Sequence, residues 1–445
     1  MTFEILSRFL QKETKVNTET LRSFLATQHA ADIAQFLNEY DVSLDWSVLS
    51  LLNLKRQAEV FSYLDRGRQT DLARCAPPNQ FVAVFTAMDP DDRVDLFNAL
   101  SEDEQKALLP ALSQVERDDL QHLAAYKEGT AGAIMTSDYA ALSPYLSVQQ
   151  ALNKLRRKAF NKESVNRIYI LDDDHKLLGS VSLQALIFAA PTTPLQHIMV
   201  PETYAVHVDE KQENVAGKIA RYDEPALPVI DAEGRIVGIV THDDALDVIT
   251  EAATKDFHKA GSIGTLAESI ERAPIALLYR ARVFWLVLLV FGNIFSGAGI
   301  VHFEALISAH MGLLFFLPLL IASGGNAGSQ ASTLTVRAMA TGEVQLKHWG
   351  HLLSREVLVA GLLGLTMAAA IYGISAWRGG LDIALVVSVA MMIIVLVGSL
   401  IGLALPFVLT RIGLDPATAS GPLVTSLADI AGVLIYFSTA QAFLF

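Results

Sequence analysis

The sequence has one cysteine, Cys75, in 445 residues. A disulfide framework or a cluster of thiolate metal ligands needs several cysteines, so both are excluded. The first residues, Met1 to Arg8, lack the apolar stretch of a signal peptide, and we expect none. A P-loop, a Gly-x-Ser-x-Gly turn and an HExxH motif are also missing, and the histidines of residues 1–279 show no ligand spacing. The sequence therefore does not point to an enzyme.

Charged residues are scarce in the last 166 residues, where seven are Lys or Arg and six are Asp or Glu. The whole chain has 34 basic and 47 acidic residues, so residues 1–279 hold 27 and 41 of them, a net charge of −14. The chain thus joins an acidic, water-soluble part to an apolar part. Nucleic acids bind to basic surfaces, so the acidic part excludes them as partners and favours cations.

Five apolar stretches in the last part are long enough to cross a bilayer, which takes about 20 residues. Four of them contain no Lys, Arg, Asp or Glu, and the fifth contains Asp429 alone. The stretches are Val283–Phe303, Ala305–Val336, Val357–Trp377, Ile383–Thr410 and Ala419–Phe445. Six basic residues fall in the loops on one side, and Arg378 alone falls on the other. This bias predicts a cell (inner) membrane protein with a cytoplasmic N-terminus and an external C-terminus.

An internal repeat with an offset of 59 residues lies between residues 161 and 250. The aligned pairs are Asp172 with Asp231, Gly179 with Gly238, and Val181 with Val240. Each copy predicts a strand, a tight acidic turn, a second strand and a helix, at Leu183–Phe188 and Asp243–Ile249. The constant offset favours a tandem pair of cystathionine-β-synthase (CBS) domains, which this pattern resembles, over a generic αβ hairpin.

The rest of the soluble part is predicted to be helical. Residues 1–125 show helical periodicity, and Ser101 with Glu104 predicts a capping box, so we expect a small helical solenoid. We therefore expect a multidomain membrane protein with an all-α superhelical domain, an α+β CBS pair and a five-helix transmembrane domain. The expected bounds are 1–130 for the acidic helical domain, 131–250 for the CBS pair, 251–279 for a connecting (plug) helix broken around Gly261–Gly264, and 280–445 for the transmembrane domain.

Two features of the apolar part suggest a path for ions. Asp429 lies inside the fifth stretch, where a carboxylate costs several kcal/mol and usually has a function; a helix–helix hydrogen bond is the alternative. Gly324 and Gly325 would weaken or break a helix in mid-membrane and free carbonyl groups toward a water-filled cavity. Asn326 and Gln330 add neutral oxygens, and close packing of small residues is the alternative for this region.

Neutral oxygens with one carboxylate suit a hard cation that keeps part of its water shell, as Mg²⁺ does. Soft ligands are lacking, which argues against copper. One aspartate carries a single negative charge, so a two-fold dimer with the pore on its axis would bring two Asp429 carboxylates to a divalent ion. We therefore expect a homodimer in a lipid bilayer, with a divalent cation as its substrate.

Over nearly its whole length the sequence resembles the MgtE family of Mg²⁺ transporters or channels. The most specific stretches are Gly324-Gly-Asn-Ala-Gly-Ser-Gln330 and the run from Asp415 to Phe437 around Asp429. The resemblance implies Mg²⁺ uptake down its electrochemical gradient, Asp429 as the pore Mg²⁺ site, and cytosolic domains that close the pore when internal Mg²⁺ is high. It also implies that Glu304 lies near the outer mouth. The residues expected to line the pore are Gly324, Gly325, Asn326, Gly328, Gln330, Asp415 and Gly432.

Acidic residues of the soluble part are candidates for the Mg²⁺ sensor. In low Mg²⁺ the carboxylates would repel one another, and bridging divalent ions would draw the connecting helices over the pore. The residues that match the family pattern are Asp91, Asp92, Glu213, Asp223, Asp244, Asp247 and Asp256; an ordinary surface charge is the alternative for each. Lys211, Ala252 and Lys255 stand where the fullest sensors have acids, so we expect weakened or displaced sites.

Thr241 and Asp244 form a Thr-x-x-Asp pattern found in nucleotide-binding CBS clefts, so ATP or another adenine nucleotide is a candidate cofactor beside Mg²⁺. Two other functions stay open: a transporter of Co²⁺ or Mn²⁺, and a membrane receptor whose CBS pair senses a nucleotide without conducting ions. Asp429 argues against the receptor, which does not need a carboxylate inside the membrane.

Overall fold

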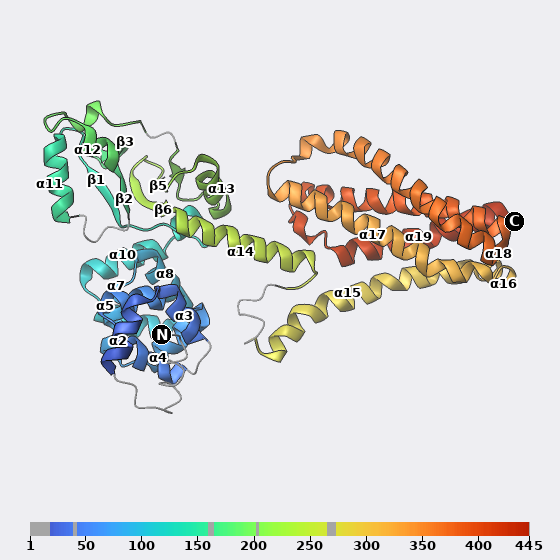
Figure 1. Cartoon of the computed structure of the whole chain (residues 1–445), viewed down its shortest axis with the longest axis horizontal. Coiled ribbons are helices and arrows are strands. Elements are labelled where there is room, and N and C mark those ends of the chain that lie inside the picture. The colour runs from blue at the N-terminus through green and yellow to red at the C-terminus, as the bar shows by residue number, and fades with distance from the viewer. Residues whose placement is uncertain (1–17, 39–41, 159–163, 202–203, 265–272, 445) are drawn as a thin grey trace. The chain divides into compact units, whose positions relative to one another are not determined.

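The computed structural model describes residues 18–38, 42–158, 164–201, 204–264 and 273–444. They divide into two compact units, Met1–Thr250 and Glu251–Phe445. The first unit contains a row of short helices and two small sheets, and the second is a bundle of long helices (Figure 1). The predicted class, a multidomain protein with an apolar helical C-terminal part, is confirmed.

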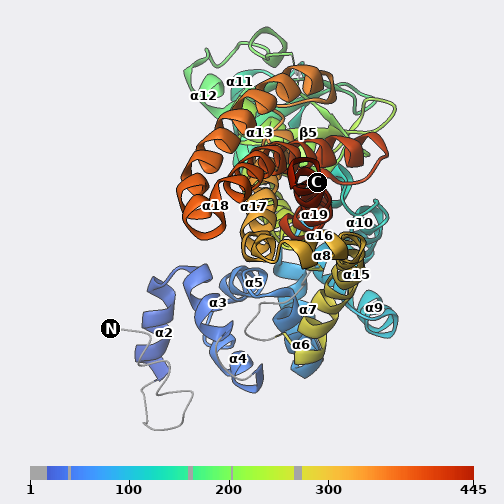
Figure 2. The same cartoon turned by 90° about the vertical axis from the view of Figure 1, so that its right-hand side faces the viewer.

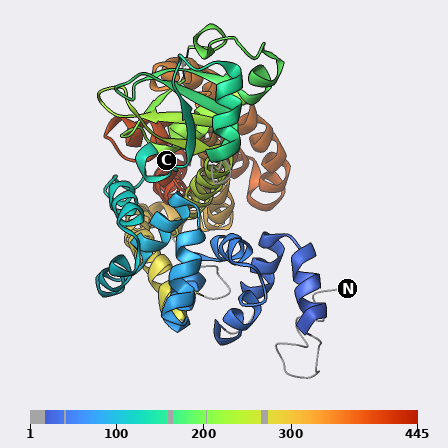
Figure 3. The same ribbon diagram turned by 90° about the vertical axis from the view of Figure 1, so that its left-hand side faces the viewer.

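The first unit begins with short helices that stack as a solenoid. Among the described residues these are α2 (Thr18–Thr27), α3 (Ala30–Asn38), α4 (Val42–Leu49), α5 (Leu54–Ser62), α6 (Arg66–Cys75), α7 (Pro78–Ala87), α8 (Pro90–Ala99), α9 (Glu102–Leu108) and α10 (Gln114–Ala124). Helices two apart in this row pack on one another, as α3 does on α5, α4 on α6, α5 on α7, α6 on α8 and α8 on α10. The first of these helices are the blue ribbons in Figure 3. Local signals start several of them: Asn53 caps α5, and Ser101 and Ser113 open α9 and α10 with capping boxes.

Two three-stranded sheets with the same topology follow. They consist of β1 (Tyr139–Leu142), β2 (Ser164–Leu171) and β3 (Leu177–Ser182), and of β4 (Val206–His207), β5 (Ala226–Ile230) and β6 (Ile236–Thr241). Helices α11 (Val148–Lys158), α12 (Leu183–Phe188) and α13 (Gln212–Tyr222) accompany them. In each sheet the first pair is parallel and the second antiparallel, with Ile170 opposite Gly179 and Val229 opposite Gly238. The repeat predicted from the 59-residue offset is confirmed.

Gly179 and Gly238 are needed because a neighbouring backbone runs against each of them. A Cβ on Gly179 would lie 2.4 Å from the carbonyl oxygen of Val200, and one on Gly238 would lie 2.8 Å from that of Thr136. Val200 bridges to β3 of the first sheet, whereas Thr136 bridges to β6 of the second. The segment that precedes each copy thus pairs with the sheet of the other copy and ties the two together.

The helix after the second sheet is longer than predicted. One continuous helix, α14 (His242–Ala260), covers both the predicted CBS helix and the start of the connecting stretch (Figure 1). The expected helix end at Ile249 is wrong because residues 242–260 contain neither Gly nor Pro. The expected break is confirmed: α14 ends before Gly261, and Ser262 takes a left-handed conformation with φ of 55°. Residues 265–272 of the stretch lie outside the described part.

The second unit is built from long apolar helices. They are α15 (Ile275–His302), the short α16 (Glu304–Ala309), α17 (Gly312–Ala340), α18 (Trp349–Arg411) and α19 (Gly421–Leu444). Apart from α16, all four are long and apolar enough to cross a membrane. Helices α17, α18 and α19 pack on one another, and α15 packs on α19 (Figure 2).

Helix α18 is a hairpin of two membrane-length halves. Its 63 residues are interrupted at Gly380, whose φ of 83° and ψ of 173° are not helical. The Trp349 ring packs on the Phe407 ring with centroids 5.1 Å apart, and Ser388 donates a hydrogen bond of 3.3 Å to the Ala368 carbonyl. These pairs show that the halves run antiparallel. Together with α15, α17 and α19, the unit has the five membrane-length segments that the sequence predicts.

Two expectations about the second segment are wrong. The segment does not start at Ala305, because residues 304–309 form the separate helix α16 and α17 begins at Gly312. Gly324 and Gly325 do not break α17, which is continuous from Gly312 to Ala340. The helix persists because the bare backbone of these glycines is covered by neighbouring helices, so the missing side chains are replaced by helix–helix contacts.

Candidate cation pathway and acidic sensor

Asp429 lies on α19, where it faces α17. A Cβ on Gly325 would lie 3.5 Å from the Asp429 Oδ1 atom and 2.8 Å from the Cγ2 atom of Thr425. The Oδ1 atom is buried and receives no hydrogen bond from any described residue. A carboxylate oxygen removed from water in this way needs a cation or a proton to balance its charge. Asp429 therefore has the setting expected of a cation ligand.

Helix α17 and the second half of α18 are in direct backbone contact. A Cβ on Gly398 would lie 2.3 Å from the Gly324 carbonyl oxygen, and one on Gly402 would lie 2.0 Å from that of Gly328. Any side chain at these positions would collide with a main-chain atom that cannot move away alone. The glycines thus hold α17 close to α18 with Gly325 beside Asp429.

The other predicted pore residues take different positions. Asn326 and Gln330 are exposed on α17, and Glu304 is exposed at the start of α16. Gly432 is buried on α19, in ordinary contact with α17 and α18. Asp415 lies before α19, where it accepts a hydrogen bond of 2.9 Å from the Ala417 backbone and forms an ion pair with Lys259 of the connecting segment. Of the predicted pore residues on other helices, the structure brings Gly325 next to Asp429, and pore lining by the rest stays a prediction.

Four of the predicted sensor acids are brought together between α8 and α14. Burial raises the pKa of Asp92 to about 6, and the charges of Asp89, Asp95 and Asp247 add to this rise against a hydrogen bond from Ser62. Burial, with repulsion from Asp243, also raises the pKa of Asp247 above its usual value. The carboxylates of the two helices therefore repel one another when all are ionised.

Asp91 and Asp244 form the direct contact within this cluster. The Asp244 carboxylate accepts a hydrogen bond of 2.5 Å from the Thr241 hydroxyl and also makes one with the Asp91 carboxyl group. Burial raises the pKa of Asp244 to about 6, although these hydrogen bonds act in the opposite direction. Two carboxyl groups at hydrogen-bonding distance must share a proton or a cation. The contact therefore favours a proton or a cation near neutral pH.

The remaining sensor candidates lie outside this cluster. Glu213 and Asp223 are exposed at the two ends of α13, and Asp223 is the left-handed C-cap with φ of 53°. Asp256 lies nine residues after Asp247 on α14. Lys255, at a position where an acid was expected, pairs with Glu251 at 2.9 Å. Within the described ranges, no three His, Cys, Asp or Glu side chains form a ready-made metal cage.

Sequence reasoning missed several members of the acidic cluster. Asp89, Asp95 and Asp243 add charge to Asp92 or Asp244, and Asp138 adds charge to Asp89. Asp89 and Asp243 stand close to the chosen acids in the sequence, in Asp89-Pro-Asp-Asp and in His242-Asp-Asp. The density of acids at these two helix starts was the available signal.

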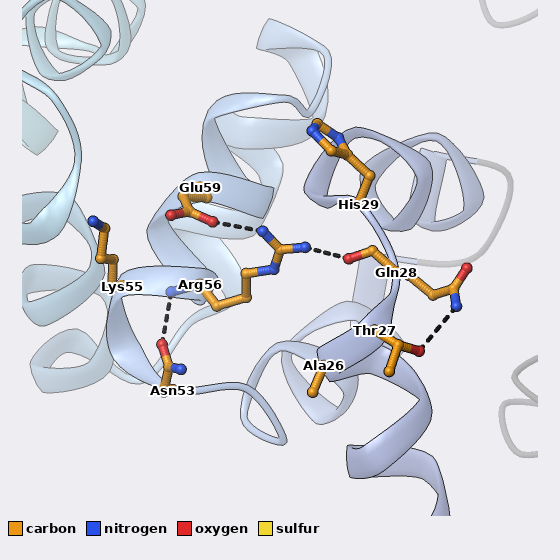
Figure 4. A pocket seen from close by; sticks show the side chains of 8 residues that line it. All are labelled: Ala26, Thr27, Gln28, His29, Asn53, Lys55, Arg56 and Glu59. Atoms are coloured by element: carbon orange, nitrogen blue, oxygen red, sulfur yellow. Dashed lines mark hydrogen bonds and ion pairs between the residues drawn. The ribbon is translucent and has the colours of Figure 1, made fainter. Parts of the chain in front are cut away.

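The Thr241–Asp244 pair predicted for a nucleotide is already engaged. Thr241 is buried at the end of β6 and its hydroxyl bonds to Asp244. A separate hollow of about 570 Å³ lies beside the start of α5 (Figure 4). Two of its charged groups, Arg56 and Glu59, pair at 2.8 Å, and Arg56 also donates to the Gln28 carbonyl oxygen, while Lys55 lines the same hollow. Thr241, Asp244 and Arg56 therefore already have partners within the chain.

The chain matches family profiles along most of its length. Residues 317–439 match the MgtE family, described as a divalent cation transporter, and residues 28–129 match the MgtE intracellular N domain. Residues 131–191 and 195–251 match the CBS domain.

Known proteins with these domains are similar over long ranges. The magnesium transporter MgtE of Thermus thermophilus is 37% identical over 433 residues, which is 96% of either chain. That of Enterococcus faecalis is 33% identical over 330 residues, or 74% of this chain and 72% of the relative. The crystal structure of the cytosolic domain of the Mg²⁺ channel MgtE in complex with ATP is 35% identical, with a TM-score of 0.52, and covers 55% of this chain and 98% of its own.

Proposed function

Because the chain belongs to the MgtE family of divalent cation transporters, we propose that it is a Mg²⁺-selective channel or transporter that carries Mg²⁺ past Asp429 and down its electrochemical gradient. The buried Asp429 Oδ1 atom carries this proposal, because it faces Gly325 and receives no hydrogen bond from the described residues. Mg²⁺ prefers oxygen ligands and keeps part of its water shell, which fits one carboxylate beside bare backbone. The relatives' shared description as magnesium transporters supports transport rather than an enzymatic reaction.

The distribution of basic residues supports the orientation of this pathway. One end of the bundle holds the turn between α17 and α18 and the turn after α18. The basic residues near these turns are Arg337, Lys347, Arg355 and Arg411, whereas Arg378 lies beside the turn at Gly380. Basic loops stay in the cytoplasm. We therefore place residues 1–279 in the cytoplasm and the C-terminus outside the cell (inner) membrane. A homodimer would add a second Asp429 and balance the charge of one Mg²⁺.

Closure by internal Mg²⁺ is the regulatory part of the proposal. The Asp91–Asp244 contact needs a cation or a proton, and Mg²⁺ at the α8–α14 cluster would supply the charge. Helix α14 is continuous from Asp244 to Lys259, whose ion pair with Asp415 reaches the segment before the Asp429 helix. Binding at the cluster would then act on the pathway through α14, which joins the two units.

The CBS pair is the proposed site of an adenine nucleotide such as ATP. A relative's cytosolic domain in complex with ATP supports this assignment. Thr241 and Asp244 are the candidate contacts, and Asp244 would then serve both the nucleotide and the sensor. Bound nucleotide is therefore expected to change the Mg²⁺ concentration at which the gate closes.

The transport proposal is tested by Mg²⁺ influx into liposomes that contain a Mg²⁺-sensitive dye. We expect influx with the wild type and its loss in Asp429→Asn, which keeps the side-chain size and removes the charge. Asp382→Asn is the matched control because Asp382 is exposed beside the Gly380 turn, and it should transport normally. Equal influx in wild type and Asp429→Asn would refute the role of Asp429.

The same assay distinguishes the other functions. Co²⁺ and Mn²⁺ are added as competitors, and inhibition at far lower concentrations than Mg²⁺ itself would identify one of them as the substrate. If the wild type shows no Mg²⁺ influx even when Mg²⁺ is kept low on the side of the soluble part, the result would favour a receptor that does not conduct ions.

A further inference from the structure

The end of α14 carries a serine at a position where glycine is usual. The Ile263 amide donates to the His258 carbonyl oxygen at 2.9 Å, and the Ser262 amide donates to that of Lys259 at 2.9 Å. These two bonds form the Schellman motif that ends many helices, and its left-handed residue is most often glycine. Here it is Ser262, with φ of 55°. Because a side chain is disfavoured in this conformation, the contacts of the Ser262 hydroxyl are informative.

The Ser262 hydroxyl meets the start of α19, the helix that carries Asp429. Its Oγ atom lies 2.5 Å from the Ser420 Oγ atom, which is hydrogen-bonding distance. Ser262 is 7% exposed and Ser420 is 1% exposed. A hydroxyl group removed from water costs free energy unless it is hydrogen-bonded, so each of these two groups supplies what the other needs.

Ser420 is also the residue that caps α19 at its N-terminus. Its Oγ atom accepts a hydrogen bond of 3.4 Å from the Leu423 amide, and its carbonyl oxygen accepts one of 3.0 Å from the Val424 amide. Asp429 follows on the same continuous helix, about 13 Å along its axis from Ser420. A displacement of Ser420 therefore also displaces Asp429.

Two further contacts hold the same junction. Ser332 on α17 donates a buried hydrogen bond of 2.8 Å to the Ala419 carbonyl oxygen, and Lys259 forms the ion pair with Asp415. The side chains of that ion pair are 34% and 42% exposed, and a pair so open to water contributes little. The Ser262–Ser420 bond is therefore the buried link between the end of α14 and α19.

We propose that Ser262 is a positioning residue for Asp429, and that α14 acts on the cation pathway by holding the N-terminal cap of α19 through the Ser262–Ser420 bond. Ser262 does not touch the ion. The Asp91–Asp244 contact and this bond are formed in the same structure, so we assign the bond to the closed state. The inference rests on the proposed transport function and on its closure by internal Mg²⁺.

The first test is Ser262→Gly, because glycine suits the left-handed backbone but has no hydroxyl group. In liposomes whose soluble parts face the interior, internal Mg²⁺ is set first and the initial rate of influx is then measured. We expect the internal Mg²⁺ concentration that halves influx to rise about threefold to tenfold. The thermal midpoint should stay equal or rise, which separates positioning from a loss of stability. His175→Gly is the matched control, since His175 is also left-handed, with φ of 62°, but lies between β2 and β3, and closure should not change.

The second test joins the two positions covalently. Ser262→Cys and Ser420→Cys are combined with Cys75→Ser, and a copper–phenanthroline oxidant is added to form the disulfide, which the short distance between the two side chains favours. We expect the oxidised chain to show no influx even at low internal Mg²⁺, and a reductant should restore it. Each single-cysteine variant, oxidised in the same way, should keep its influx.

Two results would overturn the proposal: an unchanged half-closing concentration in Ser262→Gly, or full influx through the cross-linked chain. A wild type without influx would refute the transport function instead. The cysteine pair then still tests the coupling of Ser262 to α19. A cross-link that forms faster as internal Mg²⁺ rises would support that coupling, and no cross-link at any Mg²⁺ concentration would contradict it.

Discussion

At the scale of single residues, the membrane unit depends on glycines that let two backbones touch. A Cβ on Gly402 would lie 2.0 Å from the carbonyl oxygen of Gly328, and Gly398 stands in the same relation to Gly324. Apolar side chains gain little by leaving lipid, so helices in a membrane are held together largely by such close packing. Substitution of these glycines is therefore expected to destabilise the bundle more than substitution of the leucines and valines around them.

Replacement of Gly402 by alanine is expected to separate α17 from α18. Overpacking at a backbone contact of this kind costs about 1–3 kcal/mol or more, so Gly402→Ala should lower the free energy of unfolding in detergent by at least that amount. Gly373→Ala in the same helix is the control, because a Cβ there meets no other atom within 4 Å, and it should be neutral or stabilising. Equal stability of the two variants in chemical denaturation would show that the bundle tolerates separation.

Single residues also show what the sequence could predict. Asp429 was identified because one carboxylate in a long apolar run is unusual wherever the helix lies. The continuous helix through Gly324 and Gly325 was missed, since helix propensity does not reveal which neighbouring helices cover a glycine.

At the scale of elements, the stability of the contact between α8 and α14 depends on the protonation of its carboxyl groups. The pKa of Asp92 and that of Asp244 are each raised to about 6, chiefly by burial. The closed contact therefore binds more protons than the separated elements do. The free energy that holds the contact closed is therefore largest below about pH 4. It falls as the pH rises through 6, by up to roughly 3 kcal/mol for each of the two carboxyl groups. The other charged groups near these two and their neighbours include Asp89, Asp91, Asp95, Asp138, Asp243, Asp247, Arg93 and Lys55.

Lowering the pH should accordingly close this contact as added Mg²⁺ does, because protons neutralise the same carboxylates. Energy transfer between dyes on Cys75, which is exposed on α6, and on Ala190→Cys, after α12, reports the separation in the full-length chain. We expect high transfer at pH 5.5 without Mg²⁺, low transfer at pH 7.5, and recovery at pH 7.5 when Mg²⁺ is added. Asp92→Asn with Asp244→Asn should keep transfer high at both pH values. A signal that rises with pH in the wild type would contradict this account.

The elements themselves were largely predictable. The capping box at Ser101 and the 59-residue offset of the sheets are local signals, and the structure confirms what they indicate. The full length of α14 was underestimated because the prediction stopped at the edge of the repeat. The pairing of α8 with α14 could be reached only through the family resemblance, since residues about 150 positions apart leave no periodic trace in one sequence.

At the scale of the whole molecule, charge balance is the argument for a dimer. One Asp429 supplies a single negative charge to a divalent ion in a poorly hydrated setting, and the proposed two-fold dimer would supply the second charge. The two protomers can share one pathway on a two-fold axis, or each can hold a pathway of its own. These arrangements predict different Mg²⁺ influx when only one of the two Asp429 side chains is lost. The difference does not depend on how tightly either chain binds Mg²⁺.

A mixed dimer of one wild-type chain and one Asp429→Asn chain decides between them. The two chains carry different affinity tags, so that the mixed dimer can be purified by two successive columns and placed in liposomes. We expect its Mg²⁺ influx to fall well below half that of the wild type, because the shared site keeps a net positive charge when the ion enters. The control dimer, with Asp382→Asn in one chain, should transport fully. Half of the wild-type rate would mean that each protomer conducts alone, and a chain that purifies as a monomer with full activity would remove the two-fold pathway altogether.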